Sequence, residues 1–264
     1  MQLTSLLRKA RIASRRGLGQ PVLNYQVLGE RCSGTNFLDQ LIQQNFAAAR
    51  PRYDMWKHAF PNLIALPADV LYVVIFRDPF QWLESMYGKP WHSVPELRDL
   101  AFSEFIRAEW RSEVDVPAWF DLPKTSPCKG QPLNQDLHPI TGAPFPNLLA
   151  LRRAKAEALL SLPQRGARVL YTTHAAISQN PDEIISGIAT ESPVPRNTRL
   201  EVPQGHYGWS WSNRDVKPKT PGHLITPDDR AWIRAQLDPA LEAAMGLPLD
   251  EAPSIAPTGN ATRP

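Results

Sequence analysis

The chain has little cysteine, little excess charge and no long hydrophobic run. Its two cysteines, Cys32 and Cys128, lie far apart and form neither a disulfide framework nor a metal-type pair, which indicates a reducing, cytoplasmic compartment. The formal net charge of +3 is too small to indicate a nucleic-acid partner. No apolar stretch approaches the roughly 18 residues that a membrane-spanning helix requires. These absences argue against disulfide-stapled, nucleic-acid-binding and helical membrane proteins.

Composition sets two end segments apart from the rest. Residues 1–20 carry five basic residues and no acid, without the continuous apolar stretch of a secretory signal. This segment is either a solvated terminus or a short basic amphipathic helix that contacts the inner face of a membrane. Residues 251–264 are rich in proline and small residues, which predicts a disordered tail. Residues 21–250 are long enough for one domain with a full core.

Strand-like and helix-like patterns alternate along this domain. Strands are expected at 22–28, 53–60, 69–76 and 166–173. The third of these is a continuous apolar run, which is typical of a central parallel strand covered on both faces. Such alternation predicts an α/β fold, a three-layer sandwich around a central parallel sheet.

Apolar periodicity and capping residues predict the helices between these strands. They are expected at about 35–46, 80–87, 95–110, 147–162, from 180 onward, and from 226 to about 246. The helix at 147–162 should carry Arg152, Arg153 and Lys155 on its polar side. Residues 88–146 form an insertion, and its proline-rich part, 121–146, has a length typical of functional or disordered loops.

The chain is organised around the loop from Gly29 to Asn36. A strand, a loop of small residues and a helix N-terminus together make an anion cradle, because backbone N–H groups point inward and the helix dipole favours negative charge. Gly29 and Gly34 have the spacing of the nucleotide motif G-x-x-x-x-G-K-[ST]. Thr35 and Asn36 replace the lysine and the hydroxyl of that motif, so its phosphate cation and its Mg²⁺ ligand are missing.

Three interpretations of this loop follow from the residues alone. It is a degenerate loop of a phosphotransferase or kinase, a phosphate loop of another class with Arg31 as its cation, or a strand–helix turn without a ligand. Titratable side chains also stand at the ends of two other expected strands, Lys57 and His58 near the end of the second and Arg77 after the third. Ligands of parallel sheets bind beyond the carboxyl ends of the strands, so we expect these side chains at one site.

This set resembles two motifs of the sulfotransferases that use 3'-phosphoadenosine 5'-phosphosulfate (PAPS). In that family a loop [K/R]-S-G-T-[T/N] binds the 5'-phosphosulfate, and a strand followed by R-[DN]-P, with serine eight residues after the arginine, binds the 3'-phosphate. The matching residues here are Arg31, Cys32, Ser33, Gly34, Thr35 and Asn36 in the loop, with Arg77 and Ser85 after the third strand. The resemblance implies a P-loop nucleoside-triphosphate-hydrolase-like fold and sulfuryl transfer from PAPS, with no metal ion.

Weaker matches complete the site that the resemblance implies. Lys57 and His58 resemble the family's K-x-H element, in which histidine is the base and lysine stabilises the leaving group. His174 stands where the family has a tyrosine that contacts adenine. The basic stretch with Arg214 and Lys217 resembles the loop that closes over the nucleotide.

Two loop positions depart from the family pattern. Cys32 stands where the cation before Ser-Gly-Thr is expected, and Arg31 is one position earlier, long enough to reach the anion. A thiol near a helix N-terminus can have a lowered pKa, although a small loop filler is the plainer role for Cys32. Glu30 would repel an anion unless it points away.

The acceptor is the part that the resemblance leaves open. It is expected to be a hydroxyl or amine, on a glycan or lipid-linked glycan, and to bind beside the insertion at 88–146. The alternatives are a phosphotransferase and a non-catalytic relative that holds a nucleotide or glycan. Five tryptophans are candidates for stacking on a sugar acceptor, and ordinary packing in the core or in a lid is the alternative for each. They are Trp91, Trp110, Trp119, Trp209 and Trp211.

Overall fold

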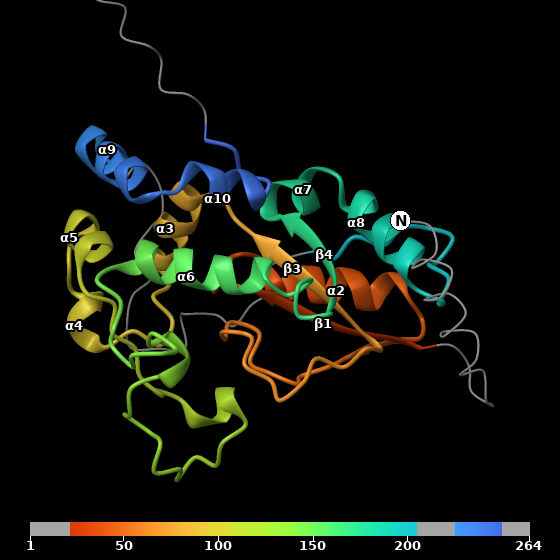
Figure 1. The fold of residues 1–264 in the computed structure, drawn as a ribbon, viewed down its shortest axis with the longest axis horizontal. Helices are drawn as coiled ribbons and strands as arrows, with labels where there is room; N and C mark the ends of the chain where they lie inside the picture. Colours follow the sequence, from red (N-terminus) through yellow and green to blue (C-terminus); the bar gives the residue numbers. More distant parts are fainter. Residues whose placement is uncertain (1–21, 205–224, 250–264) are drawn as a thin grey trace, which may run out of the picture.

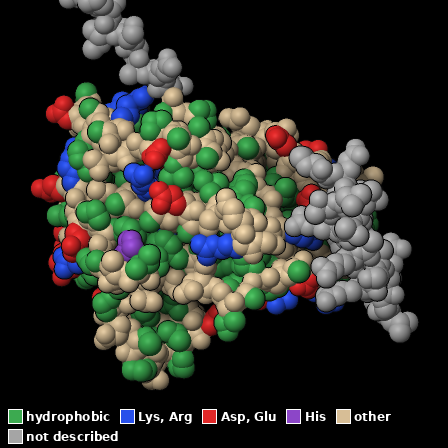
Figure 2. Space-filling view, in the orientation of Figure 1, with side chains coloured by type: hydrophobic (Ala, Val, Ile, Leu, Met, Phe, Trp, Pro, Cys, Tyr) green, Lys and Arg blue, Asp and Glu red, His purple; other side chains and the backbone are tan. Residues whose placement is uncertain are grey.

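The computed structural model describes residues 22–204 and 225–249, which form an α/β fold (Figure 1). No helix in this part of the chain is long and apolar enough to cross a membrane. Acidic and basic side chains are interspersed on the face shown in Figure 2. The expectations that lie outside the described residues concern the segments 1–20 and 251–264 and the residues Trp209, Trp211, Arg214 and Lys217.

The sheet has four parallel strands in the order β2-β1-β3-β4. The strands are β1 Leu23–Gly29, β2 Ala49–Pro51, β3 Val70–Phe76 and β4 Arg168–Thr173. Every residue of β3 is buried, which confirms the expectation of a strand covered on both faces. Gly29 is in register with Ile75, and Phe76 with Thr173, so β1, β3 and β4 end together at one edge.

The expected strand at 53–60 is wrong, because this segment is a run of turns. The edge strand β2 stops at Pro51, which has no N–H to continue a ladder. The chain then crosses the end of β1, where the Gly29 N–H donates to the Lys57 carbonyl at 3.0 Å. Lys57 and His58 therefore still reach the carboxyl edge of the sheet.

Helices cover both faces of the sheet and also its carboxyl end. One face packs against α2 Thr35–Asn45, α7 His174–Gln179 and α8 Pro181–Glu191, and the other against α6 Leu148–Leu160 and the end of α10 Pro239–Ala244. The strands point toward a third cluster (Figure 1), built mainly by α3 Pro79–Gly88, α4 Pro95–Arg98, α5 Phe102–Arg107 and α9 Pro227–Gln236.

Two helices expected from periodicity are each broken in two. The pattern at 95–110 gives α4 and α5, which are separated by residues 99–101. The pattern from 226 gives α9, with the expected Thr226 cap, and then α10, which begins at Pro239 with Asp238 as its cap. A proline fits the first turn of a helix but not its interior, so Pro239 starts a new one.

The polar side of α6 also differs from the expectation. Arg153 is exposed, but Arg152 and Lys155 are buried. Arg152 forms an ion pair with Glu242 of α10, and Lys155 forms one with Asp136 of the insertion. Buried cations need such partners, and these partners come from segments that helical periodicity cannot indicate.

Replacement of Gly29 by alanine should destabilise the fold more than the same change at an open glycine. An alanine Cβ at position 29 would lie 2.5 Å from the Ile75 carbonyl oxygen, so neighbouring strands must separate. We expect a loss of about 3 kcal/mol in the free energy of unfolding, measured by urea denaturation. The control is Gly142→Ala, where φ is +70° and nothing lies within 4 Å, with a loss of about 1 kcal/mol. Equal losses would contradict the close-approach explanation.

Candidate functional site

A cavity of about 990 Å³ opens at the carboxyl edge of the sheet. Its wall comes from the β1–α2 loop, the first half of α2, the turns at 56–58, Arg77 after β3, the end of α3, the insertion and α7. All described residues that the sequence predicts for catalysis and nucleotide binding line this cavity, except Ser33. Ser33 is buried, and its hydroxyl donates to the Glu30 carbonyl at 2.6 Å.

The β1–α2 loop presents an open helix N-terminus to the cavity. Gly34 is the N-cap of α2 with φ +99°, and it has no side chain to cap the first N–H groups of the helix. Gly34, Thr35 and Asn36 line the cavity, so their backbone lies where an anion can bind. A Cβ at position 34 would lie 2.9 Å from Cδ2 of His174, so this ring also requires glycine there.

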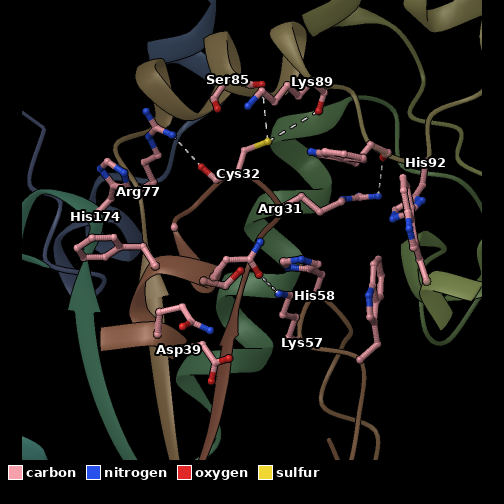
Figure 3. A pocket seen from close by; sticks show the side chains of 18 of the residues that line it. Arg31, Cys32, Asp39, Lys57, His58, Arg77, Ser85, Lys89, His92 and His174 are labelled. Atoms are coloured by element: carbon pink, nitrogen blue, oxygen red, sulfur yellow. Dashed lines mark hydrogen bonds between the residues drawn. The ribbon is translucent and has the colours of Figure 1, made fainter. Parts of the chain in front are cut away.

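Arg31 lies differently from the expectation, because its guanidinium does not extend to the N-terminus of α2. It donates to Asp136 at 2.7 Å and to the Trp91 carbonyl at 3.2 Å, and the residue is 2% exposed. Figure 3 shows it extending away from Arg77, toward His92. In this geometry Arg31 supports the insertion.

Lys57 supplies a cation at the first turn of α2. Its Nζ donates to Oδ1 of Asn36, as Figure 3 shows. Burial lowers the pKa of Lys57. The cation that Arg31 does not bring to the N-terminus of α2 thus comes from the turn that crosses the end of β1.

His58 is held as a neutral imidazole with one nitrogen available. Its Nδ1 lies 2.6 Å from the Gly29 carbonyl, which can only accept, so Nδ1 carries the proton. Burial and then the neighbouring Lys57 hold the pKa of His58 well below 6.5. Among the described residues Nε2 has no hydrogen-bond partner, and it is not sealed from solvent. His58 can therefore accept a proton at Nε2 near neutral pH.

Arg77, Ser85 and His174 form a second polar group in the cavity. Arg77 Nη1 donates to the Cys32 carbonyl at 2.8 Å, and its buried Nε has no hydrogen-bond partner among the described residues. Burial lowers the pKa of Arg77, and burial followed by the charge of Arg77 lowers that of His174. An anion here would meet a cation, a hydroxyl and a neutral imidazole.

Two loop side chains turn away from the anion position. The Cys32 thiol faces the carbonyls of Ser85 and Lys89 at 3.7 and 3.8 Å, and burial raises its pKa, so the lowered pKa considered from the sequence is wrong. Cys32 has φ +62° and acts as a loop filler. Glu30 turns toward Lys155, at 3.8 Å, and burial raises its pKa.

Sequence reasoning missed the carboxylate that anchors this region, Asp136. One of its oxygens accepts from Arg31, Trp110 and Ser112, and the other from Lys155. Burial alone would raise the pKa of Asp136, but Arg31 and Lys155 hold it well below its usual range. Asp136 lies 105 residues after Arg31, in a proline-rich stretch without a motif, so no local signal indicates it.

The aromatic wall of the cavity was predicted only in part. Trp91 and Trp119 line it as considered, and Trp56 and His92 join them. Trp110 instead is 1% exposed and packs in the core beside Arg31. His92 pairs with Asp115 through Nδ1 at 2.8 Å, across 23 residues that carry no recognisable spacing.

In the described part of the chain, no three side chains of His, Cys, Asp or Glu cluster as metal ligands. Comparison of the chain with protein-family models, with curated proteins and with solved structures gives no match. The functional assignment therefore depends on the residues of the cavity.

Removal of the Asp136 charge should strongly destabilise the protein. In Asp136→Asn the buried Arg31 and Lys155 lose their carboxylate partner. We expect the free energy of unfolding, measured by urea denaturation, to fall by about 3–5 kcal/mol. The folded-state pKa of Asp136 is depressed, so this stabilisation is present above its ordinary pKa of 3.8 and is lost as the pH falls below it.

The matched control for this variant is Glu157→Gln. Glu157 pairs with Arg153 on the surface, where both side chains are 53% exposed. Its replacement should cost less than about 1 kcal/mol. A similar small loss in Asp136→Asn would show that the buried network does not hold the fold together.

Proposed function

We propose that the protein is a sulfotransferase with a P-loop-like nucleotide site, which transfers the sulfuryl group of PAPS to a hydroxyl or amine. The observation that carries this proposal is the position of neutral His58 beside Lys57 and the open N-terminus of α2, in a cavity that also holds Arg77 and Ser85. This reaction needs two cationic sites, one for each phosphate-type group of PAPS, and one group that accepts a proton. Lys57, Arg77 and His58 are these groups.

The binding roles follow from these positions. The backbone at 34–36 and Lys57 bind the 5'-phosphosulfate, since N–H groups and a cation converge there. Arg77 and Ser85 bind the 3'-phosphate, which gives Arg77 Nε the partner that it lacks among the described residues. His174, beside Gly34, contacts the adenine.

His58 and Lys57 serve the transfer step. Nε2 of His58 takes the proton of the acceptor as the acceptor oxygen or nitrogen forms its bond to sulfur. The bridging S–O bond breaks, and its electron pair remains on the phosphate of adenosine 3',5'-bisphosphate. Lys57 and the α2 N–H groups stabilise that developing charge. A bound anion also raises the pKa of His58 and makes it a stronger base than it is in the empty cavity.

The remaining elements of the proposal concern the acceptor and the compartment. The aromatic side chains of the cavity favour a glycan or lipid-linked glycan as acceptor. Cys32 and Cys128 are both free, which favours a reducing, cytoplasmic compartment, with residues 1–20 as a peripheral contact to the membrane.

Adenosine 3',5'-bisphosphate should stabilise the protein, whereas ATP with Mg²⁺ should not. At about 100 times its Kd the nucleotide adds about 2.7 kcal/mol by mass action, which raises Tm by about 5–10 °C in a thermal-shift assay. Arg77→Ala should abolish the shift, and Arg153→Ala, on the exposed side of α6, should retain it. Stabilisation by ATP with Mg²⁺ instead, or a normal shift in Arg77→Ala, would contradict the assignment.

The pH dependence of transfer should report the protonation of His58. Protonated Nε2 cannot accept the acceptor's proton, so kcat/KM should fall as the pH falls, with its acid limb below 6.5 because the pKa is lowered. Labelled-sulfate transfer to a glycan panel measures this. His58→Gln should lower kcat about 10²–10⁴-fold with an unchanged Kd for adenosine 3',5'-bisphosphate. Full activity in that variant would remove His58 from the mechanism.

A further inference from the structure

The cavity has an aromatic end that the nucleotide roles do not use. Trp56, Trp91 and Trp119 line it and are half-buried. The rings of Trp91 and Trp119 meet edge to face, with centroids 5.1 Å apart. Figure 3 shows His92 across the cavity from Arg77 and His174. A ligand at this end would therefore lie beside the nucleotide site.

His92 is positioned in this wall by Asp115. The carboxylate accepts from Nδ1 at 2.8 Å, which leaves Nε2 unprotonated, and burial lowers the pKa of the ring. Nε2 has no hydrogen-bond partner within the described ranges and is not sealed from solvent. His92 has φ +63°, a backbone conformation that is uncommon for residues other than glycine.

The described lining of the aromatic end offers no carboxylate to a cationic ligand. The guanidinium of Arg31 lies 5.7 Å from the centre of the Trp56 ring, and the ammonium of Lys155 lies 5.8 Å from it. The only carboxylate among the described residues of the lining is Asp39, which belongs to α2 and accepts from the Tyr25 hydroxyl. Arg31 and Lys155 are already paired with the buried Asp136. A quaternary ammonium or protonated amine would therefore find no unpaired carboxylate among the described lining residues at this end.

Half-buried indole rings around an open cavity suit a ligand that is apolar on one face and polar at its edge. A wholly apolar ring would need enclosure, whereas a sugar ring stacks its C–H face on an aromatic ring and keeps its hydroxyls in water. We propose that Trp56, Trp91, Trp119 and His92 form a subsite for an uncharged sugar ring. Nε2 of His92 accepts a hydrogen bond from one of its hydroxyls.

The sugar bound at this subsite is the acceptor of the proposed sulfuryl transfer, and this role of the subsite rests on the proposed function. His58 remains the base that faces the reacting hydroxyl, and His92 binds a different hydroxyl of the same ring. The sugar therefore enters as a neutral hydroxyl acceptor, not as an amine. Binding of a sugar does not require turnover, so it can be measured separately.

The experiment is saturation-transfer difference NMR on the full chain. The probes are cellotriose, maltotriose and chitotriose, with p-nitrophenol as the aromatic comparison. We expect ring-proton signals from at least one trisaccharide. Trp119→Ala should weaken that binding at least tenfold, and so should His92→Asn, which tolerates the positive φ. Tyr53→Ala, an exposed aromatic residue outside the cavity, should bind as the parent does.

The thermal shift with adenosine 3',5'-bisphosphate separates the two proposals and also confirms that each variant is folded. Sugar signals that disappear in Trp119→Ala while the nucleotide shift persists support the subsite. If the nucleotide stabilises the protein but no trisaccharide gives a signal, or only p-nitrophenol does, the sugar subsite is wrong and the nucleotide site stands. Sugar binding without any nucleotide shift supports the subsite and overturns the sulfotransferase proposal.

Discussion

The buried pair of Arg31 and Asp136 is the interaction on which the site depends. Neither charge is accessible to water, so each requires the other, and removal of one leaves an uncompensated charge inside the protein. The same carboxylate also holds Lys155 of α6. One residue of the insertion thus joins the phosphate-type loop, a helix on the far face of the sheet and the indole ring of Trp110. The insertion is therefore part of the site's framework.

This arrangement changes how the loop is understood. Its sequence offers Arg31 as the cation, but that charge is used inside the protein, and Lys57 reaches Asn36 from a separate segment. Burial lowers the pKa of both Lys57 and His58, and an anion would relieve this. Without an anion, burial disfavours the charged forms of Lys57 and His58. The cavity is thus preorganised to bind negative charge. Such preorganisation is typical of ligand and catalytic sites.

The elements that the sequence could predict are those with local signals. β3 is an unbroken apolar run, and α9 begins with a Thr226 cap, so both were expected correctly. The partners of Arg31 and His92 could not be predicted, because they lie 105 and 23 residues away and follow no periodicity. The segment at 53–60 has strand-like composition, but Pro51 ends the ladder before it. The arrangement of the site depends on such long-range ion pairs, which residue propensities do not indicate.

Cys32 makes the loop chemically observable. The thiol faces two carbonyls between the loop and α3, and its raised pKa keeps it protonated and poorly nucleophilic. Cys128 is exposed on the insertion and offers a second thiol in contact with solvent. The natural chain therefore carries one half-buried sulfhydryl in the cavity lining and one exposed sulfhydryl. The alkylation rate of the first, relative to the second, reports how accessible the cavity side of the anion loop is, without any introduced label.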